Sequence, residues 1–129
     1  MKYFVPIALS LALLTPASAR AGEVIVNDSV TLRADEIRDV FLGEKQLAGN
    51  VRLIPIDNTG AQADFLLKVL QTDASKYYAR WTRKSRREGL TPPAIKGSDA
   101  DVIAFVKATP GAVGYVDKTT HNLKVVRTF

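Results

Sequence analysis

The stretch IDNTGAQADF (Ile56–Phe65) forms a junction at which a predicted strand ends and a predicted helix begins, with a glycine between them. Backbone N–H groups at the start of a helix have no partner inside the helix, and they can bind an anion. The stretch contains no lysine or arginine, and it contains two aspartates. The junction therefore predicts a strand–helix unit, and it raises the question of whether this helix start binds an anion.

Two interpretations of the junction follow from its residues. Thr59 and Gln62 have the spacing of a capping box, in which the two side chains satisfy the free amides of the first turn. Alternatively, the amides of Gly60, Ala61 and Gln62 bind an oxyanion. The helix dipole contributes only about 0.3–1 kcal/mol at an exposed site. No arginine fork is present locally, and Asp57 would repel an anion, so the residues favour the capping box.

Strands and helices alternate on both sides of the junction. Apolar and β-branched runs predict strands at residues 23–27, 51–57, 112–116 and 123–127. Apolar periodicity predicts helices at residues 32–43, 60–70, 73–89 and 98–109. Pro55 has no N–H group, so its strand is predicted to lie at a sheet edge or to end there. The TPP sequence (Thr91–Pro93) cannot be helical and predicts a rigid connector. The alternation of elements predicts an α/β sandwich of layers.

Polar residues and glycines predict where these helices begin and end. Asp73 can cap the third helix, and Gly89 can terminate it. Ser98 and Asp101 have the spacing of a capping box at the start of the fourth helix. Gly43 is expected to end the first helix.

The first residues of the chain predict a secretory signal peptide. The apolar run Phe4–Leu14 is too short to span a bilayer comfortably, and small residues follow it in an A-x-A pattern. We expect cleavage after Ala19, with Ala21 as the alternative site, and a membrane anchor as the alternative interpretation. The prediction is a periplasmic protein with a signal peptide at residues 1–19 and one domain at residues 20–129, without a transmembrane segment in the mature chain.

The composition limits the partners without identifying one. The 129-residue sequence has a formal net charge of +5, which favours anionic partners in general. It contains no cysteine, so an exported form must rely on its hydrophobic core instead of disulfides.

The third predicted helix carries a run of basic residues with two aromatic residues beside it. Such a surface can bind single-stranded nucleic acid, but more often the charges are solvated and the aromatic rings pack. We therefore predict no nucleic-acid partner and keep an anionic surface as the alternative. The basic residues are Lys76, Arg80, Arg83, Lys84 and Arg87, and the aromatic residues are Tyr77 and Trp81.

No group of residues predicts catalysis or a metal site. His121 is the only histidine, and without cysteine a zinc site would need mostly carboxylate ligands. No G-x-S-x-G motif is present to carry a nucleophilic serine. The sequence therefore predicts a non-enzymatic protein without a metal or cofactor.

The order of these motifs, including IRDVFLGE and TPGAVGYV, resembles the second lobe of the periplasmic phosphate-binding proteins of ABC transporters. The resemblance covers about residues 23–126, and it is closer still to small exported proteins that consist of one such lobe. It implies an α/β fold, a single lobe of a type II periplasmic-binding-protein-like fold with about four strands and flanking helices.

The resemblance also implies a function and a site. Phosphate binders of this family carry Ser-Gly-Thr where this chain has Thr59, Gly60 and Ala61, and an arginine where it has Pro55. The implied function is a binding or adaptor module linked to phosphate uptake, with a weak anion site at Thr59, Gly60, Ala61 and Gln62. The alternative is an interaction protein of the cell envelope that binds a protein partner, or a second copy of itself, across the exposed face of the lobe and has no small-molecule ligand.

Overall fold

The computed structural model describes residues 22–118 and 122–129. The predicted signal peptide and His121 lie outside these residues. The described part contains a five-stranded sheet with the strand order β5-β4-β6-β1-β7. Its strands are β1 (Glu23–Val26), β4 (Ile54–Asn58), β5 (Ala94–Lys96), β6 (Ala112–Val116) and β7 (Lys124–Thr128). β4 runs parallel to β5 and β6, whereas β1 runs antiparallel to β6 and β7.

A two-stranded hairpin and six helical segments complete the described fold. The hairpin consists of β2 (Leu47–Ala48) and β3 (Val51–Arg52). The helical segments are the 3₁₀-helix η2 (Ala34–Glu36), α1 (Ile37–Phe41), α2 (Gln62–Phe65), the π-helix η3 (Leu66–Leu70), α3 (Ala74–Glu88) and α4 (Asp99–Ala108).

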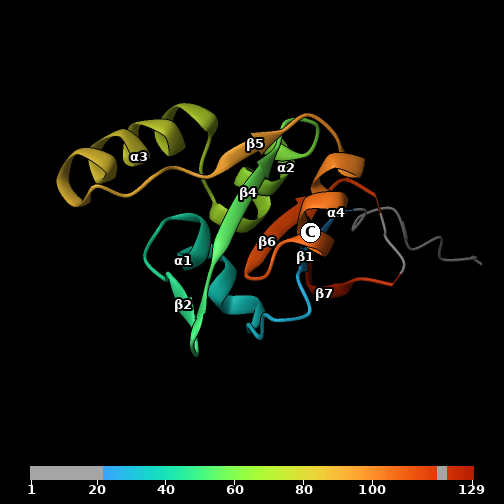
Figure 1. Cartoon of the computed structure of the whole chain (residues 1–129). Helices are drawn as coiled ribbons and strands as arrows, with labels where there is room; N and C mark the ends of the chain where they lie inside the picture. Colours follow the sequence, from blue (N-terminus) through green and yellow to red (C-terminus); the bar gives the residue numbers. More distant parts are fainter. Residues whose placement is uncertain (1–21, 119–121) are drawn as a thin grey trace, which may run out of the picture.

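Helices cover both faces of the sheet, and α3 extends beyond it (Figure 1). One face packs against α4 through Ile25, Ile56, Val102, Val106, Ala112 and Val116. The other face packs against α1, α2 and η3 through a larger cluster that includes Val24, Val26, Phe41, Phe65, Val113 and Tyr115. Successive residues of β1 and β6 alternate between the two clusters, as side chains of a strand must. The predicted layered α/β sandwich is confirmed.

An aromatic cluster fills the larger core. The Phe65 and Tyr115 rings stack with centroids 3.8 Å apart, and Phe41 meets Phe65 edge to face at 4.7 Å. The Phe129 ring meets the Phe65 ring edge to face, with centroids 5.6 Å apart. These rings come from α1, α2, β6 and the segment after β7, so they join distant parts of the chain.

The predicted helix ends are confirmed for α3 and α4. The Asp73 side chain accepts a hydrogen bond from the Lys76 N–H group at 2.9 Å, and Gly89 ends α3 with a left-handed φ of +67°. The Ser98 hydroxyl accepts from the Asp101 N–H group at 3.2 Å.

The prediction that the strand of Pro55 lies at a sheet edge or ends at this residue is wrong, because β4 lies between β5 and β6 and continues to Asn58. The N–H group of Ile54 donates to Gly111 O at 2.8 Å on the β6 side, so the nitrogen of Pro55 faces the β5 side. Pairing with β5 begins only at Ile56. Pro55 therefore costs the sheet no hydrogen bond.

Two strands were not predicted, and one predicted strand is divided. β2 and β5 have two and three residues, too few for a periodic signal, and β5 is held by pairing with β4. The predicted strand 51–57 separates at Leu53 into β3, which pairs with β2, and β4, which enters the main sheet. Among the described residues, none of the helices combines the length and the apolar character that crossing a membrane requires.

We predict that Gly114→Ala destabilises the protein by about 1–3 kcal/mol, because the added methyl group overpacks the contact between β6 and α4. A Cβ atom at Gly114 would lie 2.7 Å from Cγ1 of Val102 and 3.2 Å from Cγ2 of Val106. Urea unfolding measures the effect. Gly97→Ala is the control, since nothing lies within 4 Å of its added Cβ. Equal effects of the two substitutions would contradict close packing of α4 on the sheet.

Candidate functional site

The parallel strands β4, β5 and β6 end side by side and form the carboxyl end of the sheet. Open α/β sheets bind ligands at the carboxyl ends of their strands. The residues that follow the three strands are Thr59 and Gly60, Gly97 and Ser98, and Asp117 and Lys118, and all six are exposed. The structure thus places the residues of the sequence-predicted anion site, Thr59 to Gln62, at the carboxyl end of the sheet.

Asn58, the last residue of β4, is buried and organises the turn that follows it. Its side-chain oxygen Oδ1 accepts a hydrogen bond from the Gly60 N–H group at 3.1 Å, and its backbone oxygen accepts from the Ala61 N–H group at 3.1 Å. Two of the amides expected to bind an anion are therefore already hydrogen-bonded within the protein.

The predicted capping box at Thr59 and Gln62 is wrong. α2 begins after Ala61, and no side chain caps it. The Thr59 N–H and hydroxyl groups both donate to Lys96 O, at 2.9 and 3.2 Å, and the Gln62 amide group bonds the Tyr78 hydroxyl at 2.8 Å. The Lys96 carbonyl belongs to the unpredicted strand β5, so this competing acceptor could not be predicted from the sequence.

Asp99, at the start of α4, links the strand ends to one another. Its Oδ1 atom accepts from Asn58 Nδ2 at 2.7 Å and from the Asp117 N–H group at 3.0 Å, and Oδ2 accepts from the Lys118 N–H group at 3.2 Å. A carboxylate of the protein therefore occupies backbone amides that would otherwise be free to meet an anion. Sequence reasoning missed both Asn58 and Asp99, because only the topology brings them together.

Asp57 precedes Asn58 in β4, and it is buried with 1% exposure. Its Oδ1 accepts from the Tyr115 hydroxyl at 2.8 Å and its Oδ2 from the Tyr77 hydroxyl at 2.9 Å. Burial raises the pKa of Asp57 to about 6, and the two hydrogen bonds oppose part of that rise. Burial and the neighbouring carboxylate raise the pKa values of both tyrosines, so they stay neutral donors. Asp57 holds the sheet to α3 instead of facing a ligand.

Two of the positions at which this chain departs from the phosphate binders, Ala61 and Pro55, lie in different surroundings. Ala61 is only 2% exposed, so its side chain packs in the core instead of facing solvent. Pro55 precedes Thr59 by about 13 Å of extended strand, and it lines a groove at the opposite end of β4.

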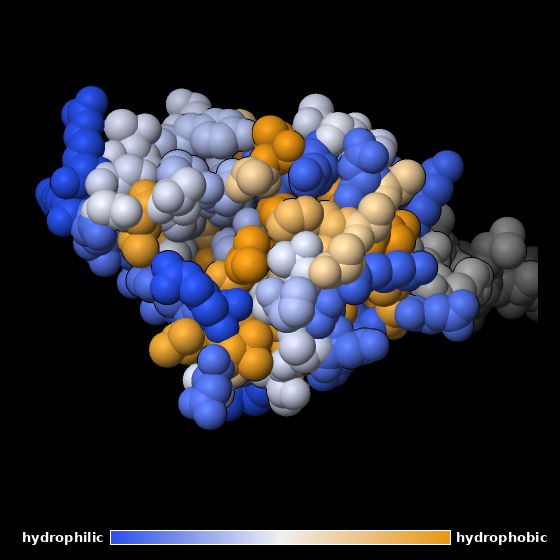
Figure 2. Space-filling view, viewed as in Figure 1, coloured by the Kyte–Doolittle hydropathy of each residue, from blue (hydrophilic) through white to orange (hydrophobic). Residues whose placement is uncertain are grey.

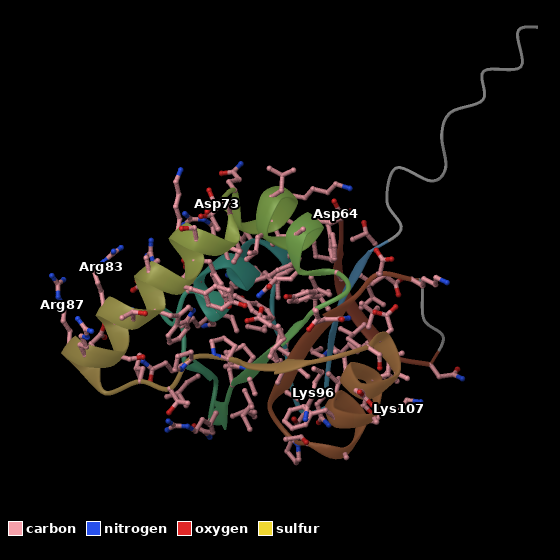
Figure 3. The ribbon with its side chains drawn as sticks, turned by 90° about the horizontal axis from the view of Figure 1, so that it is seen from above. Asp64, Asp73, Arg83, Arg87, Lys96 and Lys107 are labelled. Carbon is pink, nitrogen blue, oxygen red and sulfur yellow. The ribbon has the colours of Figure 1, made fainter. Side chains whose placement is uncertain are left out.

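Two aromatic residues of α3 pack in the core. Tyr77 and Trp81 are buried, and the Trp81 Nε1–H group donates to Phe41 O at 3.0 Å. Neither ring is available for stacking with a base. Arg83 and Arg87 point away from the body of the protein (Figure 3).

Comparisons with known proteins show the fold. No protein-family model matches the sequence, and the search of curated proteins finds no match. PstS from Borrelia burgdorferi aligns with a TM-score of 0.52 and 16% identity over 75% of this chain and 40% of that chain. An ABC-type phosphate transport receptor from Vibrio cholerae aligns with a TM-score of 0.50 and 15% identity over 84% of this chain and 46% of that chain. The chain spans less than half the length of either of these proteins, and it has the fold of a single periplasmic-binding-protein-like lobe, as predicted.

We predict that Asp57 lowers the stability of the protein as the pH rises from about 4 to 6. The folded protein holds a proton on Asp57 in this range, whereas the unfolded chain, with a pKa near 3.8, does not. Stability is therefore highest below the unfolded pKa and falls as the pH rises through the folded pKa, by roughly 3 kcal/mol at most. Urea unfolding between pH 4 and pH 7 measures this slope.

Asp57→Asn isolates this contribution, because its neutral amide can bond both tyrosine hydroxyls without titrating. The pKa values of Glu36 and Glu44 are lowered, mainly by hydrogen bonds, and these groups add a slope of opposite sign in both proteins. The difference between wild type and variant therefore reports Asp57. An unchanged slope in the variant would show that Asp57 does not titrate in this range.

Proposed function

We propose that the protein is an exported, non-catalytic binding module related to phosphate-binding proteins, which binds phosphate or a similar oxyanion weakly at Thr59, Gly60, Ala61 and Gln62. One observation carries the proposal. These residues follow a parallel strand at the carboxyl end of the sheet, where open α/β sheets bind ligands. The fold is shared with PstS and with an ABC-type phosphate transport receptor.

The hydrogen bonds at the carboxyl end of the sheet limit the affinity for an anion. The Gly60 and Ala61 amides donate to Asn58, so an anion must use the remaining amides of the first turn of α2 or displace these bonds. Asp64 adds a negative charge in that turn. Water and salt also weaken charge interactions at an exposed helix start. The expected dissociation constant is millimolar.

The proposed module binds without catalysis, metal or cofactor. One structural relative is described as PstS and the other as an ABC-type phosphate transport receptor, and neither description names an enzyme. Among residues 22–118 and 122–129, no three His, Cys, Asp or Glu side chains are grouped to hold a metal ion.

A second candidate function is interaction with another macromolecule of the cell envelope. The observation that favours it is an apolar groove at the other end of β4, away from Thr59. Exposed apolar surface of this kind is typical of binding sites.

We predict that about 10 mM phosphate or sulfate shifts the backbone amide resonances of Gly60 and Gln62 in an NMR titration of the purified protein. Gly60→Asp should abolish these shifts, because it places a negative charge at the helix start, where space allows a side chain. Gly60→Ala is the matched control and should retain them. If the wild-type protein shows no shift at this concentration, the anion-binding proposal fails.

We predict that export leaves a mature chain that begins at Arg20, or at Gly22 if cleavage follows Ala21. Intact-mass measurement of the protein from a periplasmic extract distinguishes the two sites. A large charged residue at the cleavage position blocks processing, so Ala19→Arg should leave the longer form or shift the cut. Recovery of only the full-length chain, in the cytoplasm, would contradict export.

A further inference from the structure

A groove of about 350 Å³ lies beside the first half of β4, at the end of the strand opposite to the candidate anion site. One wall is the segment that follows α1, and the other is the connector at residues 89–93 between α3 and β5. Figure 2 shows apolar residues across the middle of this face. The apolar side chains that line the groove include Val40, Leu53, Ile54, Ile56, Trp81 and Leu90.

The groove is a gap in the sheet that two proline sites maintain. β5 pairs with β4 only from Ile56 onward, and before that point the connector with Pro92 and Pro93 runs apart from β4. Pro55 has no N–H group to offer on this side, so the chain's own backbone does not close the gap. Ile54 remains 37% exposed on the groove floor.

The charged side chains that line the groove are basic. Lys45 and Arg52 are the charged residues of its lining, which contains no carboxylate. Lys45 is paired with Glu36 at 3.0 Å, whereas Arg52 is exposed and forms no ion pair within the described residues. An apolar gap with a basic rim is complementary to an apolar ligand that carries negative charge.

We infer that this groove binds a short apolar peptide segment flanked by acidic residues, presented by another protein. Apolar side chains of the segment pack on Leu53 and Ile54, and a flanking carboxylate pairs with Arg52. This inference rests on the second proposed function and does not require phosphate binding.

Charge argues against two other occupants. A second copy of this chain would bring the same basic rim against Arg52, and the chain carries a net charge of +5. Residues 1–21 of the same chain include Lys2 and Arg20 but no aspartate or glutamate, so they cannot supply the carboxylate.

Trp81 provides a direct readout, because it is the only tryptophan of the chain and lines the groove. The probes are three octapeptides: DELVLVDE, its basic counterpart KKLVLVKK, and DESTSTDE, which keeps the acidic ends without the apolar centre. We expect DELVLVDE to change the Trp81 emission and to bind at least about tenfold more tightly than the other two. Dodecanoate tests an anionic amphiphile as the occupant.

Two pairs of variants locate the binding. Arg52→Glu and Ile54→Asp should each weaken binding of DELVLVDE by about tenfold or more. Arg127→Glu and Val125→Asp are the matched controls, since both lie on β7 at the far edge of the sheet, and Val125 is 39% exposed. The controls should change the affinity by no more than about twofold, as expected for distant sites.

Several outcomes would overturn the inference. They are equal binding of KKLVLVKK, binding of dodecanoate without binding of DELVLVDE, absence of any peptide binding, or an equal loss in Arg127→Glu and Arg52→Glu. Circular dichroism confirms that each variant is folded, and if Ile54→Asp unfolds, Ile54→Thr replaces it with an expected smaller loss. The phosphate titration is a separate measurement at residues 60 and 62, so failure of either proposal is recognised independently.

Discussion

The hydrogen bonds from Tyr77 and Tyr115 to the buried carboxylate of Asp57 are the interaction on which the rest of the structure depends. A buried carboxylate without partners would cost several kcal/mol, so both hydroxyl groups must stay in place. Tyr115 lies on β6 and Tyr77 on α3, so this requirement fixes the neighbouring strand and the long helix to β4. The Tyr115 ring also stacks on Phe65, which extends the constraint from the polar cluster into the aromatic core.

Asn58, the residue after Asp57, determines which backbone donors remain free at the carboxyl end of the sheet. Asn58 bonds the turn amides of Gly60 and Ala61, and through Asp99 it connects to the residues that follow β6. These bonds join β4, β6 and α4 at a place where a binding protein leaves donors free for its ligand. The internal network strengthens the lobe, and it also leaves fewer donors for an anion. This loss of free donors is the reason why we expect the proposed oxyanion site to bind weakly.

The two ends of β4 therefore differ in chemistry. At its carboxyl end, polar side chains of the protein satisfy one another. At its beginning, Pro55 and the proline connector leave an open apolar groove with Arg52 at its rim. The two sites share a strand but no side chain, so binding at one does not require binding at the other. The anion site and the peptide groove that we propose are therefore separate surfaces of one lobe.

The sequence by itself determined the layered α/β class, the ends of α3 and α4, and the position of β6. Each depends on local signals: Asp73 and Ser98 accept hydrogen bonds from amides three residues later, Gly89 adopts a left-handed conformation, and AVGYV is a buried apolar run. The resemblance of IRDVFLGE and TPGAVGYV to phosphate binders likewise predicted the lobe that the structural comparisons show.

Only the tertiary structure decided the position of β5, the central place of β4 and the bonds of Thr59. β5 has three residues, and its pairing with β4 comes from contacts about 38 residues apart that no local pattern encodes. The Thr59 hydroxyl donates to the Lys96 carbonyl on β5, and the Gly60 N–H group donates to Asn58. The predicted capping box therefore does not form. Local motifs predict a hydrogen bond correctly only where no distant element offers a better partner. For this reason the ends of α3 and α4 could be predicted from the sequence, whereas the start of α2, the site and the groove could not.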